Sequence, residues 1–154
     1  MSFFNTMNIA ATGLTAQRVR MDIIAENIAN VNTTRTADGG PYRRKTVLFE
    51  EIRDVDPFSA TFGRIFGGRG DAPALQGHGV RVNRIAEDPS PGLLSFDPTH
   101  PDADEYGYVR LPNVNIVEEM VNMISASRSY EANITAMQNA RTLTQRTLEI
   151  GQGR

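Results

Sequence analysis

Residues 113–149, NVNIVEEMVNMISASRSYEANITAMQNARTLTQRTLE, decide the fold of this chain. The stretch follows Pro112 and contains no proline or glycine, the residues least favourable inside a helix. Its larger apolar residues recur every seven positions, a spacing that predicts one long helix with an apolar stripe. One row holds Ile116, Met123, Tyr130 and Met137, and the other Met120, Ile134 and Leu148, with polar interruptions at Ser127, Arg141 and Thr144. Because such a helix is marginal in water alone, the stripe must pack against another element.

A second long helix is predicted over residues 3–32, where two rows repeat the same spacing. One row holds Met7, Leu14, Met21 and Ile28, and the other Ala10, Ile24 and Val31, with Gln17 as the polar exception. Gly13 weakens this helix, since a glycine inside a helix costs ~1 kcal/mol relative to alanine. The matching stripes predict that the two helices pair as an antiparallel coiled coil.

The segment between the helices, residues 33–112, holds all eight prolines and most of the glycines, so no long helix fits there. Four stretches are strand candidates: Tyr42–Ile52, Gly79–Ile85, Leu93–Phe96 and Tyr106–Leu111. The glycine-rich stretch Phe58–Ala74 is expected to be a flexible loop. The predicted fold is therefore mainly α with a small irregular β insert, in three parts: residues 1–32, the insert domain 33–112, and residues 113–154.

Composition excludes several classes of protein. The formal net charge is −2, so the chain lacks the excess of positive charge that is typical of nucleic-acid-binding proteins. There is no cysteine, and hence no disulfide framework or thiolate metal site. No stretch approaches the ~18 apolar residues of a membrane span, and the amino terminus lacks the basic and apolar regions of a cleaved secretory signal. We therefore expect a protein that is not embedded in a membrane.

One acidic cluster could bind a hard metal ion, since carboxylates with one imidazole suit several divalent ions. It comprises Asp97, His100, Asp102, Asp104 and Glu105. Prolines in and beside the same run impose turns, and acidic residues beside prolines are common in solvated loops. We favour the loop interpretation and predict no metal, no cofactor and no catalytic residue.

The length of the helices and the residues beside the stripes favour an assembly protein over a simple hairpin. At 1.5 Å per residue the two helices would be roughly 45–55 Å long, beside an insert too small to cover them. Ten of the 11 asparagines lie in the helical parts, where neutral amides can hydrogen-bond to neighbouring helices without burying charge. We therefore expect contacts with other subunits, while a plain helical hairpin and a coiled-coil binding module or adaptor remain open.

Three groups of residues carry a resemblance to a known family. They are Asn27, Asn30, Asn32 and Thr33; then Asp97, Pro98, His100, Pro101, Asp104, Tyr108, Pro112 and Asn113; and finally Glu119, Arg128 and Asn133. With the residues around them, they resemble the rod and hook family of flagellar axial proteins over essentially the whole chain. The turn at residues 35–40, RTADGG, differs from the usual form of this family.

The resemblance implies a structural subunit of the proximal rod of the bacterial flagellar basal body, polymerising into the tubular drive shaft that transmits torque and surrounds the export channel. It implies a periplasmic location, reached through the flagellar type III export system. The implied partners are the chain itself, the rod proteins FlgB, FlgF, FlgG and FliE, the inner-membrane rotor ring and the export apparatus. Another axial subunit, of the distal rod or hook type, is the alternative. The apolar rows above, with Ser127, are the expected subunit and coiled-coil interface.

Overall fold

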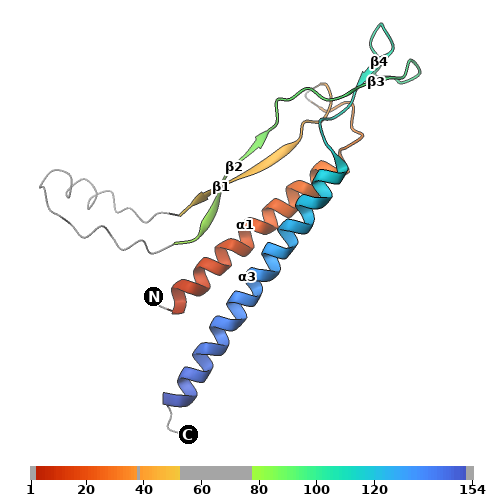
Figure 1. The fold of residues 1–154 in the computed structure, drawn as a ribbon. Helices are drawn as coiled ribbons and strands as arrows, with labels where there is room; N and C mark the ends of the chain where they lie inside the picture. Colours follow the sequence, from red (N-terminus) through yellow and green to blue (C-terminus); the bar gives the residue numbers. More distant parts are fainter. Residues whose placement is uncertain (1–2, 38, 53–77, 152–154) are drawn as a thin grey trace, which may run out of the picture.

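The computed structural model describes residues 3–37, 39–52 and 78–151. Its elements follow in the order α1 (Phe3–Ala29), β1 (Lys45–Glu51), β2 (Val80–Glu87), β3 (Leu94–Phe96), β4 (Tyr108–Arg110) and α3 (Ile116–Gly151). The two helices lie side by side, the ribbon of β1 and β2 runs along α1, and β3 and β4 lie at the end where α3 begins (Figure 1). The described chain is mainly helical with small antiparallel sheets, which confirms the predicted fold in outline.

Two close contacts define how α1 and α3 pair. Asn27 donates from Nδ2 to Glu119 Oε2 over 3.0 Å. Gly13 lies 14 residues before Asn27, and a Cβ placed on it would be 2.9 Å from Oδ1 of Asn133, which lies 14 residues after Glu119. Equal steps in opposite directions define an antiparallel pair with one unbroken register. At position 13, glycine removes a side chain where the helices approach closely.

Small and polar residues form most of the seam between the helices. The buried positions of α3 are Glu119, Ala126 and Ala140. Those of α1 are Ala10, Gly13, Ala16, Ile24 and Asn27. Small side chains let the helices approach but bury little apolar area, so the hydrophobic core of the pair is thin. Within the described residues, neither helix is long and apolar enough to cross a membrane.

Three residues of the predicted stripe of α3 lie outside its contact with α1. Ile116, Met120 and Leu148 are 45%, 54% and 60% exposed. The row that faces α1 runs through Glu119, one position before Met120, and continues through Ala126 and Ala140. The prediction followed the largest apolar side chains, whereas close helix packing selected small ones. As contacts with other subunits, the three exposed residues stay predictions.

Asparagine side chains mark the ends of both helices. Asn30 donates from Nδ2 to the Glu26 carbonyl over 2.9 Å, directly after the last residue of α1. At the start of α3, Asn115 Oδ1 accepts from the Val117 backbone N–H over 3.0 Å, as an N-capping residue does. The predicted first helix is therefore three residues too long at its end, and the predicted last helix starts three residues too early.

The strands form two separate antiparallel pairs, β1 with β2 and β3 with β4. All four fall within or overlap the predicted strand candidates. A register shift between Leu48 and Phe49 bends the longer ribbon, and Thr12 of α1 accepts from the Val80 backbone N–H over 3.2 Å, holding β2 to the helix. The predicted loop Phe58–Ala74 lies outside the described residues.

Candidate functional site at the junction of the helices and the insert

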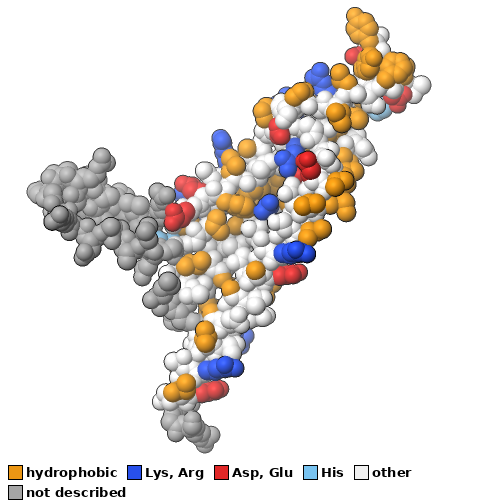
Figure 2. All heavy atoms as spheres, viewed as in Figure 1, with side chains coloured by type: hydrophobic (Ala, Val, Ile, Leu, Met, Phe, Trp, Pro, Cys, Tyr) orange, Lys and Arg blue, Asp and Glu red, His pale blue; other side chains and the backbone are white. Residues whose placement is uncertain are grey.

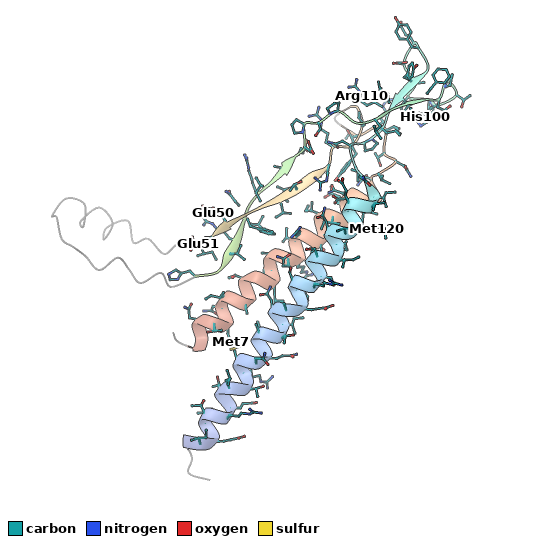
Figure 3. The ribbon with its side chains drawn as sticks, in the orientation of Figure 1. Met7, Glu50, Glu51, His100, Arg110 and Met120 are labelled. Atoms are coloured by element: carbon teal, nitrogen blue, oxygen red, sulfur yellow. The ribbon has the colours of Figure 1, made fainter. Side chains whose placement is uncertain are left out.

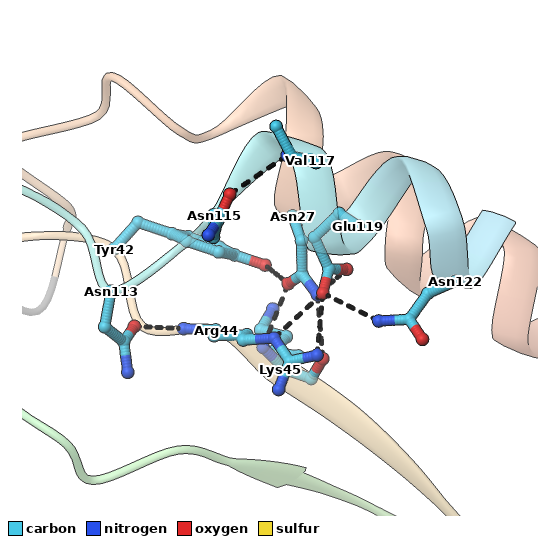
Figure 4. Close-up of polar contacts among 9 residues, drawn as sticks. All are labelled: Asn27, Tyr42, Arg44, Lys45, Asn113, Asn115, Val117, Glu119 and Asn122. Atoms are coloured by element: carbon cyan, nitrogen blue, oxygen red, sulfur yellow. Dashed lines mark hydrogen bonds and ion pairs between the residues drawn. The ribbon is translucent and has the colours of Figure 1, made fainter.

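The side chain of Asn27 lies at the centre of a buried polar junction between α1, α3 and the start of β1 (Figure 4). Its Nδ2 donates to the Lys45 carbonyl over 2.8 Å and to Glu119 Oε2 over 3.0 Å. Its Oδ1 accepts from the Tyr42 hydroxyl and from the Lys45 backbone N–H, both over 2.9 Å. Both donors and both acceptor positions of the amide are used, so Asn27 can be 1% exposed without losing hydrogen bonds.

Glu119 carries a buried charge that Arg44 compensates. Arg44 donates from Nε and Nη2 to Glu119 Oε1 over 2.9 and 2.7 Å, and Asn122 Nδ2 lies 3.4 Å from the same oxygen. Glu119 is 1% exposed, while the Arg44 side chain keeps 25% of its surface exposed. A buried carboxylate requires this pairing, because desolvation disfavours an unpaired charge. The ion pair fixes the chain before β1 onto α3.

Burial and nearby carboxylates both raise the pKa of the Tyr42 phenol. Desolvation, followed by the charges of Glu26, Glu87 and Glu119, raises the pKa of the Tyr42 phenol to about 12. The hydroxyl therefore stays protonated at neutral pH and donates to Asn27 Oδ1. Lys45 covers the ring at 5.6 Å from its centroid and pairs through Nζ with Glu26 over 2.6 Å.

Asn113 extends the junction to the segment that leads into α3. Its Oδ1 accepts from the Arg44 backbone N–H over 2.8 Å. Its Nδ2 lies 3.2 Å from the carbonyl oxygens of Asp88 and Ser90, to which it donates. One side chain thus joins two segments of the insert to the chain just before the last helix begins. Together with Asn27 and Glu119, it sets the position of the insert on the helix pair.

Four of the five residues of the acidic cluster, Asp97, His100, Asp102 and Asp104, form hydrogen bonds in the tip around β3 and β4, where His100 and Arg110 lie (Figure 3). Asp97 accepts from the Thr99 hydroxyl and backbone N–H, which lowers the pKa of the Asp97 carboxyl. His100 Nδ1 accepts from the Asp102 backbone N–H, and Asp102 Oδ2 from the Thr34 hydroxyl. Asp104 accepts from two backbone N–H groups of the next turn. Among the described residues, no three metal-binding side chains gather as an ion would require.

The residues predicted for the interface fall into three sets by burial. Ile24 is buried. The half-buried set comprises Met7, Leu14, Met21, Ile28, Val31, Met123, Ser127, Tyr130, Ile134 and Met137. Ile116, Met120 and Leu148 are exposed. The helix pair leaves much of the predicted stripe partly open to solvent, so their role between subunits stays a prediction.

The residues of the family resemblance are divided between the junction and the surface. Asn27, Asn113 and Glu119 meet at the junction, whereas Asn30 and Thr33 bond to each other beside it. Pro112 is buried and Asn133 packs at Gly13. Of the remainder, Asn32 is exposed in the turn after α1 and Arg128 is exposed on α3, and the tip holds Asp97, Pro98, His100, Pro101, Asp104 and Tyr108.

A broad apolar surface stays uncovered on the first turns of α3. Val117, Val121 and Ile124 are more than half exposed, next to Ile116 and Met120. Further exposed apolar side chains lie in the tip, among them Leu93 and Tyr106. Figure 2 shows hydrophobic side chains along the helix pair and at this end of the molecule. Large exposed apolar patches are typical of surfaces that contact other proteins.

Sequence reasoning missed the roles of Tyr42, Arg44 and Gly13. Tyr42 and Arg44 bond to residues more distant along the chain, and no periodic spacing connects them. Gly13 was interpreted as a weak point of the helix, although it permits the close contact with Asn133. The signal that could have found the seam is the recurrence of small residues at heptad spacing, with Ala126 and Ala140 14 residues apart.

Comparison with known proteins connects these features to one family. The family model for flagella basal body rod proteins matches residues 7–35, and the model for the carboxy-terminal part of flagellar basal body rod FlgEFG proteins matches residues 106–150. The flagellar basal-body rod protein FlgC of Borreliella burgdorferi is 48% identical, and those of Bacillus subtilis and Escherichia coli are 44% and 37% identical. Each alignment covers 99% of this chain and 100% of the relative. The chain therefore belongs to the FlgC family of flagellar basal-body rod proteins.

Proposed function

We propose that this chain is a structural subunit of the flagellar basal-body rod, in its proximal section, and has no enzymatic role. The observation that carries the proposal is identity of 37–48% to FlgC proteins over 99% of the chain. The side chains suited to chemistry support it: those of the junction hold elements together, and Asp97, His100, Asp102 and Asp104 of the acidic cluster form hydrogen bonds within the fold. The proposed role is mechanical.

The exposed apolar surface supports assembly as the mechanism. A helix pair with a thin core and uncovered valine, isoleucine and methionine side chains gains stability when neighbours cover these residues. Head-to-tail contacts that do not close into a ring produce a helical filament. In the proposed rod, such contacts make a stiff tube that transmits torque, with the helices of all subunits as a coiled-coil wall around the export channel.

Each of the three parts of the chain has its own proposed role in the rod. Residues 1–32 and 113–154 form the tube wall, and residues 33–112 form an outer domain. The junction around Asn27 and Glu119 holds the outer domain at a fixed position. The proposed partners are further copies and the rod proteins FlgB, FlgF, FlgG and FliE, with the rotor ring and export apparatus at the base. The proposed route to this location is the flagellar type III export system.

Complementation tests this function. Cells that lack their own FlgC and express this chain should assemble basal bodies and swim. The variant Ile134→Asp should abolish both, because it places a charge on the half-buried face of α3. Motility assays and electron microscopy of isolated basal bodies measure the two effects.

The matched control for this test is Thr135→Asp, which adds the same charge at the adjacent, exposed position. It should retain motility. Normal swimming of the Ile134→Asp cells would remove this face of α3 from the assembly, and failure of the unchanged chain to restore basal bodies would contradict the rod function itself.

A further inference from the structure

A cavity of about 320 Å³ lies between α1, β1 and α3. Its lining combines charged and amide side chains with apolar ones. Arg44, Lys45, Glu119 and Asn122, which are drawn in Figure 4, belong to the polar part. A cavity of about 150 Å³ holds one benzene molecule, so this one has room for a charged group on a short apolar stem.

Arg20 of α1 is the cation in this lining that has no counter-charge. Arg44 pairs with Glu119 over 2.7 Å, and Lys45 pairs with Glu26 over 2.6 Å. Within the described residues, no ion pair or hydrogen bond reaches the half-buried Arg20 side chain. A charge taken partly out of water is stabilised by a partner of opposite sign. The cavity therefore has one positive charge that these carboxylates leave unbalanced.

The lining also offers hydrogen-bond donors and apolar contacts. Arg44 uses Nε and Nη2 on Glu119, so the donors of its Nη1 have no acceptor among the described residues. A guanidinium group can bind a carboxylate through two parallel hydrogen bonds. Ile23, Val47 and Phe49 line the same cavity, and Phe49 is 37% exposed. Such a lining suits an anion that carries an apolar stem.

We infer that this cavity is a binding site for one carboxylate group on a short apolar stem. Arg20 binds the carboxylate, and the apolar side chains of the lining contact the stem. A carboxylate fits better than a phosphate dianion, because its single charge balances Arg20 while a second negative charge would be repelled by Glu119. Two sources can supply the group: a free carboxylic acid, or an aspartate or glutamate side chain of a neighbouring protein chain. The site adds a binding role to the proposed structural one.

Equilibrium dialysis with hexanoate tests the free acid, using the full chain in its assembled, helical state. If a free acid is the ligand, hexanoate binds at one site per chain. Arg20→Gln should weaken this binding by roughly tenfold or more, because it removes charge-assisted hydrogen bonds. Arg18→Gln, at an exposed position of the same helix, is the matched control and should leave binding unchanged. Hexylamine, similar in size but opposite in charge, should not compete.

Genetics tests a carboxylate from a neighbouring chain, which would fill the cavity in the assembly and exclude hexanoate. In complemented cells, Arg20→Glu should then abolish swimming, because it places a second negative charge beside the incoming one. Arg20→Lys, which keeps the cation, and the exposed control Arg18→Glu should both retain swimming. Suppressors of Arg20→Glu should replace an aspartate or glutamate, in this chain or in another rod protein, by a neutral or basic residue.

The two experiments together decide the inference. Hexanoate binding that Arg20→Gln removes supports a free acid, and suppressors at acidic residues support a neighbouring chain. Every other result overturns the carboxylate site: hexanoate binding that Arg20→Gln leaves unchanged, or no binding together with normal swimming of the Arg20→Glu cells or with suppressors only at other residue types. Complementation by the unchanged chain is scored separately and dialysis does not depend on it, so failure of the rod function and failure of this site are distinguishable.

Discussion

At the scale of single residues, the Glu119 side chain links three parts of the fold. It is the point where α3, α1 and the segment before β1 meet, and each of its oxygens accepts a different partner. A buried polar group that is satisfied in only one arrangement favours that register over alternatives. In this chain, a shift of the helix pair would separate Asn27 from Glu119.

We predict that Glu119→Leu lowers the free energy of unfolding by roughly 3 kcal/mol, the range for removing one partner of a buried ion pair. The variant leaves Arg44 without its carboxylate and takes one acceptor from Asn27. Chemical denaturation of the assembled, helical protein, followed by circular dichroism, measures the loss. The exposed neighbour Glu118 is the control, since Glu118→Leu should change stability by less than about 0.5 kcal/mol. Similar values for both variants would show that the junction is not a stability determinant.

At the scale of the helices, the contact of Gly13 with Asn133 sets how closely α1 and α3 approach. Alanine is the better helix former by ~1 kcal/mol, yet its Cβ would lie 2.9 Å from Asn133 Oδ1, and the Asn133 amide is held to the Ser129 carbonyl over 2.9 Å. We predict that Gly13→Ala stabilises the Asn133→Ala variant by about 1 kcal/mol. In the native chain, the same substitution should stabilise by less than this or should destabilise. Thermal unfolding of the four proteins in their assembled, helical state measures the difference; an identical gain in both backgrounds would rule out the contact.

The elements themselves were largely predictable from sequence, because prolines and asparagines mark where helices stop and heptads mark where they run. The face of α3 that packs against α1 was not predictable. The larger side chains indicated a row through Met120, while the seam runs through Glu119 and the alanines. Size is a poor guide when helices pack closely and other subunits are expected to cover the large residues. The junction was predictable only in part: Asn27 and Glu119 belong to the resemblance, but their meeting with Tyr42 and Arg44 is a tertiary contact that no local spacing encodes.

At the scale of the whole molecule, the chain combines long helices with a thin core. The helices hold 27 and 36 residues, and most of their buried apolar residues are alanines. We predict that the purified chain in dilute solution has far less helix than these lengths imply, and gains it on assembly. Far-ultraviolet circular dichroism over a concentration series measures this. A dilute chain with full helix and a sharp melting transition would favour a self-sufficient hairpin instead.

The bond between Asn27 and Glu119 joins residues 92 positions apart. Native contacts of such high sequence separation slow folding, because a long loop must close before they form. A ribosome that has made α1 must still produce the whole insert before α3 exists to pair with it. The two helices of a newly made chain therefore cannot pair before synthesis is nearly finished.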